Sequence, residues 1–438
     1  MAKENVLFVT DHPALPSGVG KKSKEIIGSS LDEINWTCLG GNSNPRKRSI
    51  RTYEKDFFED PNGSGSVNVF PHRQHGNYSL FSRLIEKNDI DKALFFGDPN
   101  NFYWLRENKS EIQTPLYYYH VWDNLPVPEF NKGFYECFEW IGAISLTTYY
   151  ILEEVYSGNY SYVPHGADEN TFYPITENLS RVIEWKGRKT TEYQIIKEIK
   201  EDWLGDKDFI IFWCNRNLQR KNAADVIRSF HQFTEEFPEA RKDDFALLMK
   251  TDHEDREGPN LAAVADAIAD DCDIRILPEY ISDQRLNWYY NIADVTLNIA
   301  NREGFGLPTE ESLLSGTPIL VNKTGGLLDQ CGFKEENGKF ISPQSEKLQK
   351  YVNKEISNSG KWVNILKPEV QTLSGTQTEP YIYDDYVSTE EVVNQLKDIF
   401  MKGEKARKKA GMKGRTYVMG HLSLEQMTQG VKKGILRN

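Results

Sequence analysis

The chain has 438 residues and a mass of 50.5 kDa, which is more than one compact core accommodates, so we expect two domains. Hydrophobic residues make up 39% of the sequence and aromatic residues 12%, which excludes a chain disordered throughout. The 65 acidic residues outnumber the 53 basic ones and give a net charge of −12, which excludes a uniformly basic surface made to coat nucleic acid.

The sequence predicts no membrane span and no secretion signal. Its longest apolar runs, such as Phe209–Cys214, are far shorter than the roughly 20 residues that a membrane-spanning helix needs. The chain enters an apolar run at Val6 with no basic stretch of the signal type before it. The five cysteines are scattered without a Cys-x-x-Cys pair, which argues against a disulfide framework and a cysteine zinc site. We therefore expect a soluble protein of the reducing cytoplasm.

The first half of the chain alternates short apolar runs with helical patterns. A strand is predicted at Val6–Thr10 and a helix at about 21–31, joined by a loop that contains Gly18 and Gly20. Glycines let a ligand approach the backbone and a helix start favours anions, so both glycines are candidate donor-binding residues. Further strands are predicted at Ala93–Phe96, Leu116–His120, Ala143–Thr147 and Tyr160–Pro164.

Residues 176–208 are polar and charged and are predicted to link two lobes, after which the alternation starts again. Strands are predicted at Phe209–Cys214, Phe245–Lys250, Ile274–Leu277, Val295–Ile299 and Pro318–Val321. Helices are predicted at Asn222–Phe233, Asn260–Ile268, Asp283–Asn291 and Pro308–Ser315. Two such series predict an α/β protein with two Rossmann-like, doubly wound domains, residues 1–175 and 209–400, facing each other across a cleft.

The stretch NREGFGLPTEESLLSGTPILV, residues 301–321, contains two glutamates eight positions apart. Glu303 precedes a Gly-Phe-Gly turn, and Pro308 suits the first position of a helix because its missing N–H would be unpaired there. The turn and the helix start offer free N–H groups and a positive dipole, an arrangement that holds a phosphate. The pattern is typical of a nucleotide-sugar site, with the sugar at Glu303 and the ribose at Glu311. An ordinary surface helix with acidic residues is the alternative.

This stretch resembles the Glu-x7-Glu motif of the retaining GT-B glycosyltransferases, in particular family 4, and the resemblance is good over roughly residues 209–332. It implies that Glu303 contacts the donor sugar and Glu311 the ribose. It also implies donor binding by the residues between them: Gly304, Phe305, Gly306, Leu307, Pro308 and Thr309. The turn Thr324-Gly325-Gly326 resembles the Gly-Gly turn that follows in the family. Glu310 departs from the family, which usually has an apolar residue there.

Upstream, Asn215-Arg216-Asn217-Leu218 and Lys221-Asn222 resemble the family's Gly-Arg-Leu…Lys-Gly signature. The resemblance implies that Arg216 and Lys221 act on the leaving diphosphate, where preorganised cations stabilise the charge that develops. Lys250, at a strand end, is a further candidate donor-binding residue. His120 is a candidate catalytic residue, because the family has a histidine near the sugar at about this position. Solvated surface cations and a satisfied core histidine are the alternatives.

The resemblance implies a retaining enzyme that uses a nucleotide sugar as co-substrate, with no metal ion and no cofactor. In this family the reaction is thought to occur on one face of the sugar, with the leaving phosphate helping to deprotonate the acceptor. Two cations and a helix dipole would supply what a metal otherwise supplies. In this fold the first domain presents the acceptor, and the basic segment 401–438 is expected to form a helix that crosses back to it.

Basic residues of the first domain point to the kind of acceptor. Arg46, Lys47, Arg48 and Arg51 lie in one loop, and Arg73 follows nearby in the sequence. Cations that face a cleft suit a polyanion, for example DNA with hydroxymethylated bases, which some phage GT-B enzymes glycosylate. A lipid-linked or polysaccharide acceptor is the alternative, and a non-catalytic nucleotide-sugar sensor is the alternative of another class. Plain solvation of these cations explains them equally well.

Overall fold

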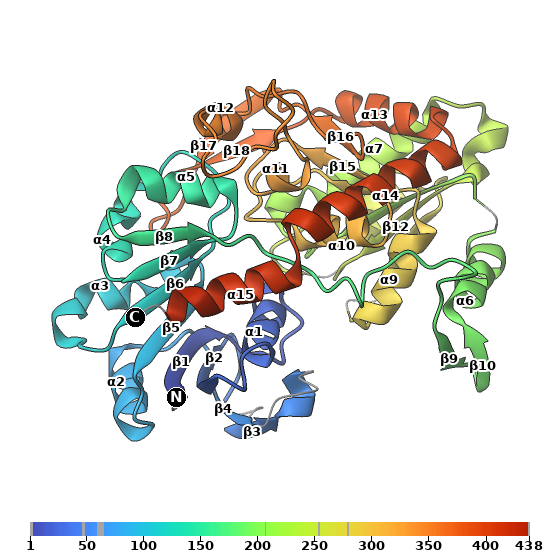
Figure 1. Ribbon diagram of the computed structural model, residues 1–438. Coiled ribbons are helices and arrows are strands. Elements are labelled where there is room, and N and C mark those ends of the chain that lie inside the picture. The colour runs from blue at the N-terminus through green and yellow to red at the C-terminus, as the bar shows by residue number, and fades with distance from the viewer. Residues whose placement is uncertain are drawn as a thin grey trace. The chain divides into compact units, whose positions relative to one another are not determined.

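The computed structural model describes residues 3–45, 49–58, 65–205, 207–252, 255–277 and 280–436 (Figure 1). The chain divides into two compact units, each built from separate stretches of sequence. Unit 1 comprises Met1–His165, Ser374–Ile382 and Glu425–Asn438, and unit 2 comprises Gly166–Leu373 and Tyr383–Leu424. The predicted bounds of 1–175 and 209–400 treat each domain as one continuous stretch, whereas the chain passes from one unit to the other four times.

Unit 1 is built on an eight-stranded sheet with the strand order β3-β4-β2-β1-β5-β6-β7-β8. Only β3 runs antiparallel to its neighbour among these described strands. Val6–Val9 in the central strand are fully buried, as a sheet covered by helices on both faces requires. The strands are β1 (Glu4–Asp11), β2 (Ile34–Gly41), β3 (Arg51–Glu54), β4 (Ser66–Pro71), β5 (Lys92–Gly97), β6 (Leu116–His120), β7 (Trp140–Ala143) and β8 (Asn159–Tyr162). The helices are α1 (Gly18–Gly28), α2 (Tyr78–Lys87), α3 (Trp104–Glu107), α4 (Lys132–Tyr135), α5 (Leu146–Val155) and α15 (Leu424–Ile435).

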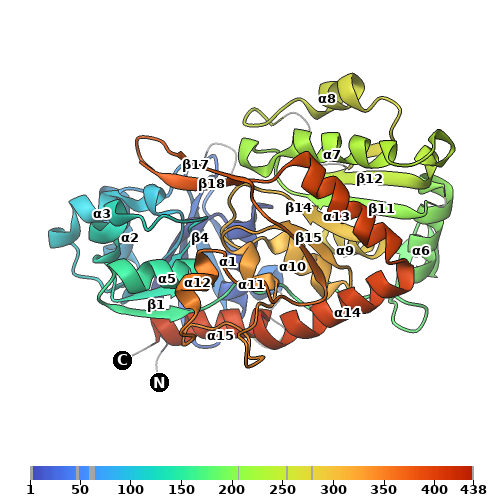
Figure 2. The ribbon, with the colours of Figure 1, turned by 90° about the horizontal axis from the view of Figure 1, so that it is seen from above.

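Unit 2 is built on a six-stranded parallel sheet with the order β13-β12-β11-β14-β15-β16. Its strands are β11 (Phe209–Cys214), β12 (Phe245–Lys250), β13 (Ile274–Leu277), β14 (Val295–Asn298), β15 (Ile319–Asn322) and β16 (Val363–Leu366). Its helices are α7 (Ala223–Glu235), α8 (Leu261–Ile268), α9 (Asp283–Ile292), α10 (Leu307–Leu314), α11 (Leu327–Gln330), α12 (Leu348–Val352), α13 (Thr389–Met401) and α14 (Glu404–His421). Figure 2 shows α7 and α13 side by side over this sheet, where their apolar faces share one core. The two sheets confirm the prediction of two Rossmann-like domains.

One predicted strand of unit 1 is wrong. The sequence analysis predicts a strand at Ala143–Thr147, but the strand ends at Ala143 and α5 begins at Leu146. Ser145 caps this helix, since its side chain accepts a hydrogen bond from Thr148 N and the Thr148 hydroxyl accepts one from Ser145 N. This capping box starts a helix in a run that looks apolar enough for a strand.

The segment 176–208, predicted as a linker, has its own secondary structure: an antiparallel pair, β9 (Val182–Trp185) and β10 (Arg188–Thr191), followed by α6 (Glu192–Glu198). The fully buried carboxylate of Glu192 anchors it within unit 2. Glu192 accepts hydrogen bonds from the side chains of Tyr173, Gln284 and Trp288 and from the N–H of Arg181. Such complete pairing is what makes a buried charge tolerable.

The segment 401–438 forms two helices where the sequence analysis expects one. Its helix α14 belongs to unit 2, and α15 belongs to unit 1 from Glu425 onward. In unit 1 the side chain of Lys92 donates to Ile435 O at 2.9 Å, and Gly434 packs against the ring of Trp140. None of the helices described is long and apolar enough to cross a membrane.

Candidate functional site

The loop that carries Glu303 joins the end of β14 to the start of α10 in unit 2. The N–H of Gly326 donates to Glu303 O at 2.7 Å. The side-chain amide of Gln330 donates to Phe305 O at 2.7 Å and to Gly306 O at 3.0 Å. Gly306 has a φ of +91°, in the left-handed region that favours glycine. The Gly-Phe-Gly turn is thus fixed by hydrogen bonds to its backbone.

The turn Thr324-Gly325-Gly326 packs directly on this loop. A Cβ atom at position 326 would lie 2.0 Å from Gly304 O and 2.7 Å from Phe305 Cα, so only glycine fits there. The hydroxyl oxygen of Thr324 also lies 3.1 Å from Asn301 O. The second glycine of the turn therefore has a steric role in holding the Glu303 loop.

Lys221 and Glu303 form an ion pair between Nζ and Oε2, although they lie 82 positions apart in the sequence. Only 6% of Lys221 and 9% of Glu303 is exposed. Two buried opposite charges stabilise each other, while either alone would be costly to bury. The structure thus brings together the cation and the carboxylate that the sequence analysis assigns to the diphosphate and to the sugar.

The short turn that presents Lys221 ends at Asn222, which has a φ of +55°. Asparagine tolerates this left-handed conformation better than most residues, which explains how it replaces the glycine of the resembled signature. Its side-chain amide donates to Ile299 O at 2.9 Å and also contacts the Asn301 side chain. Two further bonds join the same segments: the N–H of Asn301 donates to Arg220 O at 2.8 Å, and the Arg220 guanidinium donates to Arg302 O at 2.9 Å. Asn222 and Asn301 are positioning residues that the sequence analysis missed.

Arg216 lies in the loop after β11, and 59% of its side chain is exposed. Its Nε donates to Asp255 Oδ2 at 2.6 Å, and this bond holds the pKa of Asp255 below its usual range. The described contacts therefore pair Arg216 with Asp255 and not with Glu303. Lys250 ends the neighbouring strand β12, opposite Cys214, and its carbonyl accepts from the N–H of Asn215 at 3.3 Å.

Helix α10 begins at Leu307, with Gly306 at its N-cap, so Pro308 is the second helical residue and not the first as predicted. The Thr309 hydroxyl donates to Gly306 O at 2.7 Å within this first turn. Glu311 is 5% exposed and accepts a hydrogen bond from the hydroxyl of the buried Tyr290 at 2.9 Å. Tyr290 thus fixes the carboxylate that the sequence analysis assigns to the ribose.

The departure at Glu310 has a structural explanation. Its side chain is fully buried, and its Oε1 accepts the N–H of Ala167 at 2.9 Å. Ala167 also forms a parallel β-bridge with Ser423, and Gly166 packs against the backbone of Ser423. Gly166 is the first residue of unit 2 and Leu424 the last. Glu310 therefore fixes the start of unit 2 at Ala167, which is paired with Ser423 near the end of the unit.

The remaining candidates lie in unit 1. His120 ends β6 and is fully buried, with its Nε2 hydrogen-bonded to the Tyr135 hydroxyl at 3.1 Å. Burial lowers the pKa of His120 to about 3, so its imidazole is neutral at physiological pH. Helix α1 begins at Gly18, so Gly18 and Gly20 lie in its first turn and not, as predicted, in the loop before it, and the Ser17 side chain accepts the N–H of Gly20 at 3.0 Å. A Cβ at Gly20 would lie 2.8 Å from Leu15 O, so this glycine is needed for close packing of the loop.

The loop before α1 is held by Asp11 at the end of β1. Its carboxylate accepts hydrogen bonds from the Ser17 hydroxyl at 2.7 Å, the Asn42 amide at 2.8 Å and His75 Nε2 at 2.9 Å. Burial raises the pKa of Asp11, but the hydrogen bonds from His75 and Ser17 outweigh it and the pKa is lowered. Asp11 is therefore an ionised anchor beneath the glycine loop, and the sequence analysis missed it.

Of the acceptor-side candidates, Arg46, Lys47 and Arg48 lie outside the described residues. Arg51 opens the edge strand β3 and is exposed, and Arg73 is exposed in the loop after β4. Both therefore present positive charge on the surface of unit 1.

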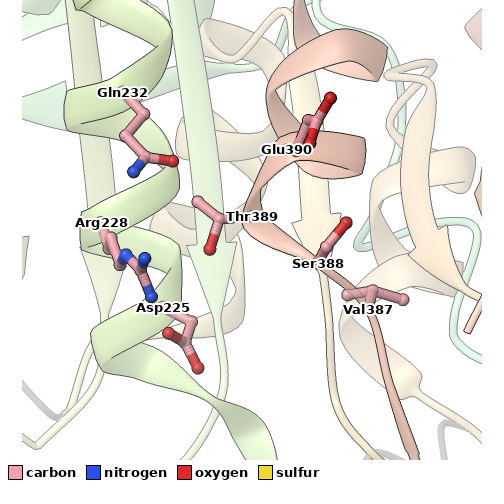
Figure 3. A pocket seen from close by; sticks show the side chains of 7 residues that line it. All are labelled: Asp225, Arg228, Gln232, Val387, Ser388, Thr389 and Glu390. Carbon is pink, nitrogen blue, oxygen red and sulfur yellow. The ribbon is translucent and has the colours of Figure 1, made fainter. Parts of the chain in front are cut away.

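Two other features of unit 2 lie apart from the predicted site residues. A surface hollow of about 510 Å³ between α7 and the start of α13 is lined by Asp225, Arg228, Gln232, Val387, Ser388, Thr389 and Glu390 (Figure 3). His231, Glu235 and Asp271 bring potential metal-binding atoms within 4.8 Å of one another, a grouping that the sequence analysis did not predict. The ammonium of Lys242 pairs with both of these carboxylates, so a lysine already supplies the positive charge there.

Comparisons with known proteins agree with this geometry. Residues 195–367 match the family model described as glycosyl transferases group 1. The chain is 24% identical over 239 residues to trehalose synthase of Pyrococcus horikoshii, covering 54% of each chain. It is 25% identical over 199 residues to alpha-monoglucosyldiacylglycerol synthase of Acholeplasma laidlawii, covering 45% of this chain and 44% of that protein. The matches thus span about half the length of these relatives.

The fold itself is shared over nearly the whole chain. The crystal structure of Anabaena HepE in complex with UDP and glucose aligns with a TM-score of 0.65 over 98% of both chains, at 11% sequence identity. A likeness at this identity concerns the fold alone. Together with the family match it confirms the predicted GT-B fold class.

Proposed function

We propose that this chain, whose residues 195–367 form a glycosyl transferases group 1 domain, is a retaining glycosyltransferase that moves a sugar from a nucleoside-diphosphate sugar to a hydroxyl acceptor. The observation that carries the proposal is the buried pair of Lys221 and Glu303 beside the Gly-Phe-Gly turn and the start of α10. A cation, a carboxylate and a helix start meet there, as recognition of a sugar diphosphate requires.

The pair also provides a way to respond to the donor. Without a ligand, Glu303 neutralises Lys221. In the proposed complex the diphosphate pairs with Lys221 in place of Glu303, because phosphate oxygens are strong acceptors for an ammonium group. Glu303 can then accept hydrogen bonds from sugar hydroxyls. The leaving diphosphate is stabilised by Lys221 and by the N–H groups at the start of α10, and Glu311 accepts from the ribose. Arg216 would contribute only after leaving Asp255.

We propose that no metal ion and no cofactor take part, because Lys221 and the helix start supply positive charge at the place where negative charge develops on the leaving diphosphate. The acceptor hydroxyl attacks the anomeric carbon from the face that the diphosphate leaves, and the leaving phosphate accepts its proton. The sugar keeps its configuration because the new bond forms on the face where the old one breaks. His120, with a pKa of about 3, is neutral and can act only as a polar neighbour of the sugar and not as a proton donor at neutral pH.

Two acceptor classes have support. The exposed Arg51 and Arg73 of unit 1 favour a polyanion, of which DNA with hydroxymethylated bases is the example we propose. The similarity to a glucosyldiacylglycerol synthase favours a lipid acceptor instead. In both cases a hydroxyl group attacks the same donor, so the chemistry in unit 2 is unchanged.

The decisive experiment incubates the protein with a pool of nucleotide sugars and either hydroxymethylcytosine DNA or diacylglycerol vesicles, and follows nucleoside diphosphate release and acceptor mass. A mass gain identifies both the acceptor and the sugar. Glu303→Gln should lower diphosphate release by about 10²- to 10³-fold, whereas Glu336→Gln, at an exposed position paired with Lys347, should have no effect. Donor binding by the wild-type protein without diphosphate release would instead establish the non-catalytic sensor.

A further inference from the structure

The two strands β17 (Val370–Ser374) and β18 (Ile382–Tyr386) form a hairpin (Figure 2). Its residues are divided between the two units. The part up to Leu373 and the part from Tyr383 belong to unit 2, whereas the tip, Ser374–Ile382, belongs to unit 1. Two of the four passages of the chain between the units are therefore made by this one hairpin.

At the base of the hairpin, Asp385 is 1% exposed and holds the Glu303 loop from one side. Its N–H donates to Asn301 O at 2.9 Å, two residues before Glu303. Its carboxylate accepts the Thr324 hydroxyl at 2.6 Å and pairs with the ammonium of Lys354. Asp385 thus binds both segments that fix Glu303. One is the segment that precedes Glu303, and the other is the Thr324-Gly325-Gly326 turn, which donates to the carbonyl of Glu303.

The neighbouring residue Asp384 adds a second connection. Its Oδ1 accepts a hydrogen bond from the Arg302 guanidinium at 2.7 Å, and both side chains are largely buried. Arg302 directly precedes Glu303. The strand β18 therefore contacts two consecutive residues of the loop, at Asn301 through the backbone and at Arg302 through an ion pair.

The tip of the hairpin is bound within unit 1. The Tyr381 hydroxyl donates to Val127 O at 3.3 Å and accepts the N–H of Glu129 at 3.1 Å. Its ring lies 4.9 Å from that of Phe130, at 86° to it, which is a favourable edge-to-face arrangement. The Tyr103 hydroxyl, which donates to Asn131 Oδ1 at 2.7 Å, lies 3.2 Å from Thr378 O. Only three residues separate Tyr381 from Asp385, so the chain between the bound tip and the base is short.

We propose that the β17–β18 hairpin is a positioning element that couples the Glu303 loop to unit 1, with Tyr381 as its anchor at the tip and Asp384 and Asp385 as its anchors at the base. The proposal rests on the proposed function only for its catalytic consequence. When Tyr381 is bound in unit 1, β18 holds Asn301 and Arg302 and thereby the Glu303 carboxylate. When the tip is released, the loop gains freedom, while the backbone of Lys221 keeps its hydrogen bond to Leu218 O and the first turn of α10 keeps the bond from the Thr309 hydroxyl to Gly306 O. Turnover then depends on the tip, whereas affinity for the nucleoside diphosphate, which lacks the sugar that Glu303 binds, does not.

The test compares Tyr381→Ala and Tyr381→Phe with Tyr386→Ala, a matched control on the same strand whose side chain is 40% exposed. The first readout is hydrogen exchange at the amides of Gly326 and Asp385, which donate to Glu303 O and Asn301 O. We expect faster exchange at both amides in Tyr381→Ala, with other amides of the unit 2 sheet unchanged. Tyr381→Phe, which keeps the ring and loses two hydrogen bonds, should lie between Tyr381→Ala and the wild type.

The second readout separates turnover from binding. Tyr381→Ala should lower kcat for diphosphate release from the donor by about 10- to 100-fold, because a reacting group misplaced by about 1 Å costs about 10²-fold and a loosened loop is displaced only part of the time. The Kd for nucleoside diphosphate should change less than threefold, and Tyr386→Ala should match the wild type in all readouts. Unchanged exchange at Gly326 and Asp385 in Tyr381→Ala, or equal effects of Tyr386→Ala, would overturn the coupling. If the wild type releases no diphosphate from any donor, the proposed function fails, and the exchange experiment still decides the coupling.

Discussion

The contact between Gly326 and Gly304 allows a quantitative prediction for Gly326→Ala. The added Cβ would lie 2.0 Å from Gly304 O, whereas real Cβ atoms essentially never approach another atom closer than 3.0 Å. The atoms nearest to it belong to the backbone of Gly304 and Phe305, which cannot rotate away as a side chain can. The turn and the Glu303 loop must therefore separate by about 1 Å, which also stretches the hydrogen bond from Gly326 N to Glu303 O. A misplacement of about 1 Å at a reacting group lowers turnover by about 10²-fold.

The assay measures kcat for diphosphate release, the Kd for nucleoside diphosphate, and urea unfolding of Gly326→Ala against the wild type. We expect kcat to fall by about 10²-fold, and the free energy of unfolding to fall by about 1–3 kcal/mol, as for other overpacked sites. Gly420→Ala is the control, because a Cβ at this exposed glycine near the end of α14 meets nothing within 4 Å. Wild-type turnover and stability in Gly326→Ala would refute the reasoning that this glycine holds Glu303 in place.

Three further predictions concern charge and burial. Lys221→Met should lower the free energy of unfolding in urea by about 3–5 kcal/mol, because it leaves the buried Glu303 unpaired. The double variant with Glu303→Gln should lose less stability than the two single variants together. Losses that simply add would contradict the pairing. Burial lowers the pKa of His120 from 6.5 to about 3, so as pH falls the unfolded state is protonated at a higher pH than the folded state. The free energy of unfolding should therefore fall by about 1.4 kcal/mol per pH unit below pH 6.5. His120→Asn should reduce this slope between pH 6 and pH 4, and an unchanged slope would show that His120 does not cause it. Every cysteine is buried in the described structure except Cys272, which is half-buried and whose pKa is raised by burial to about 11. A thiol reagent at pH 7.4 should therefore label the native protein slowly and at Cys272. Rapid labelling of several cysteines would contradict the burial.

Much of unit 2 could be predicted because its strands are continuous apolar runs. The strand Phe209–Cys214 has the predicted bounds, since six consecutive apolar residues between polar segments have few other interpretations. In unit 1 the strand β2, Ile34–Gly41, was missed because its sequence INWTCLGG mixes polar residues and glycines into the run. Its burial is decided by its neighbours β1 and β4, which sequence patterns do not identify.

The candidate site was predicted unevenly for a similar reason. Glu303, the glycine turn and Lys221 lie in local patterns whose residue types match a known chemistry, and the structure brings them together. Asp384 and Asp385 lie in no such pattern, and their link to Asn301 and Arg302 depends on a contact between segments 82 or more positions apart. Asn222 did leave a signal, because an asparagine in place of the family's glycine is typical of a left-handed backbone position.

The placement of α15 in unit 1 has a consequence for the order in which the protein is made. The last strand of the unit 1 sheet in the chain is β8, but Trp140 and Lys92 of this sheet contact Gly434 and Ile435, which are synthesised much later. These partners follow His165 by more than 250 residues, and a ribosome that adds about 5–20 residues per second needs tens of seconds to reach them. Unit 2 is synthesised in that interval and can fold first as a body. The unit that starts the chain is thus the one that finishes folding last.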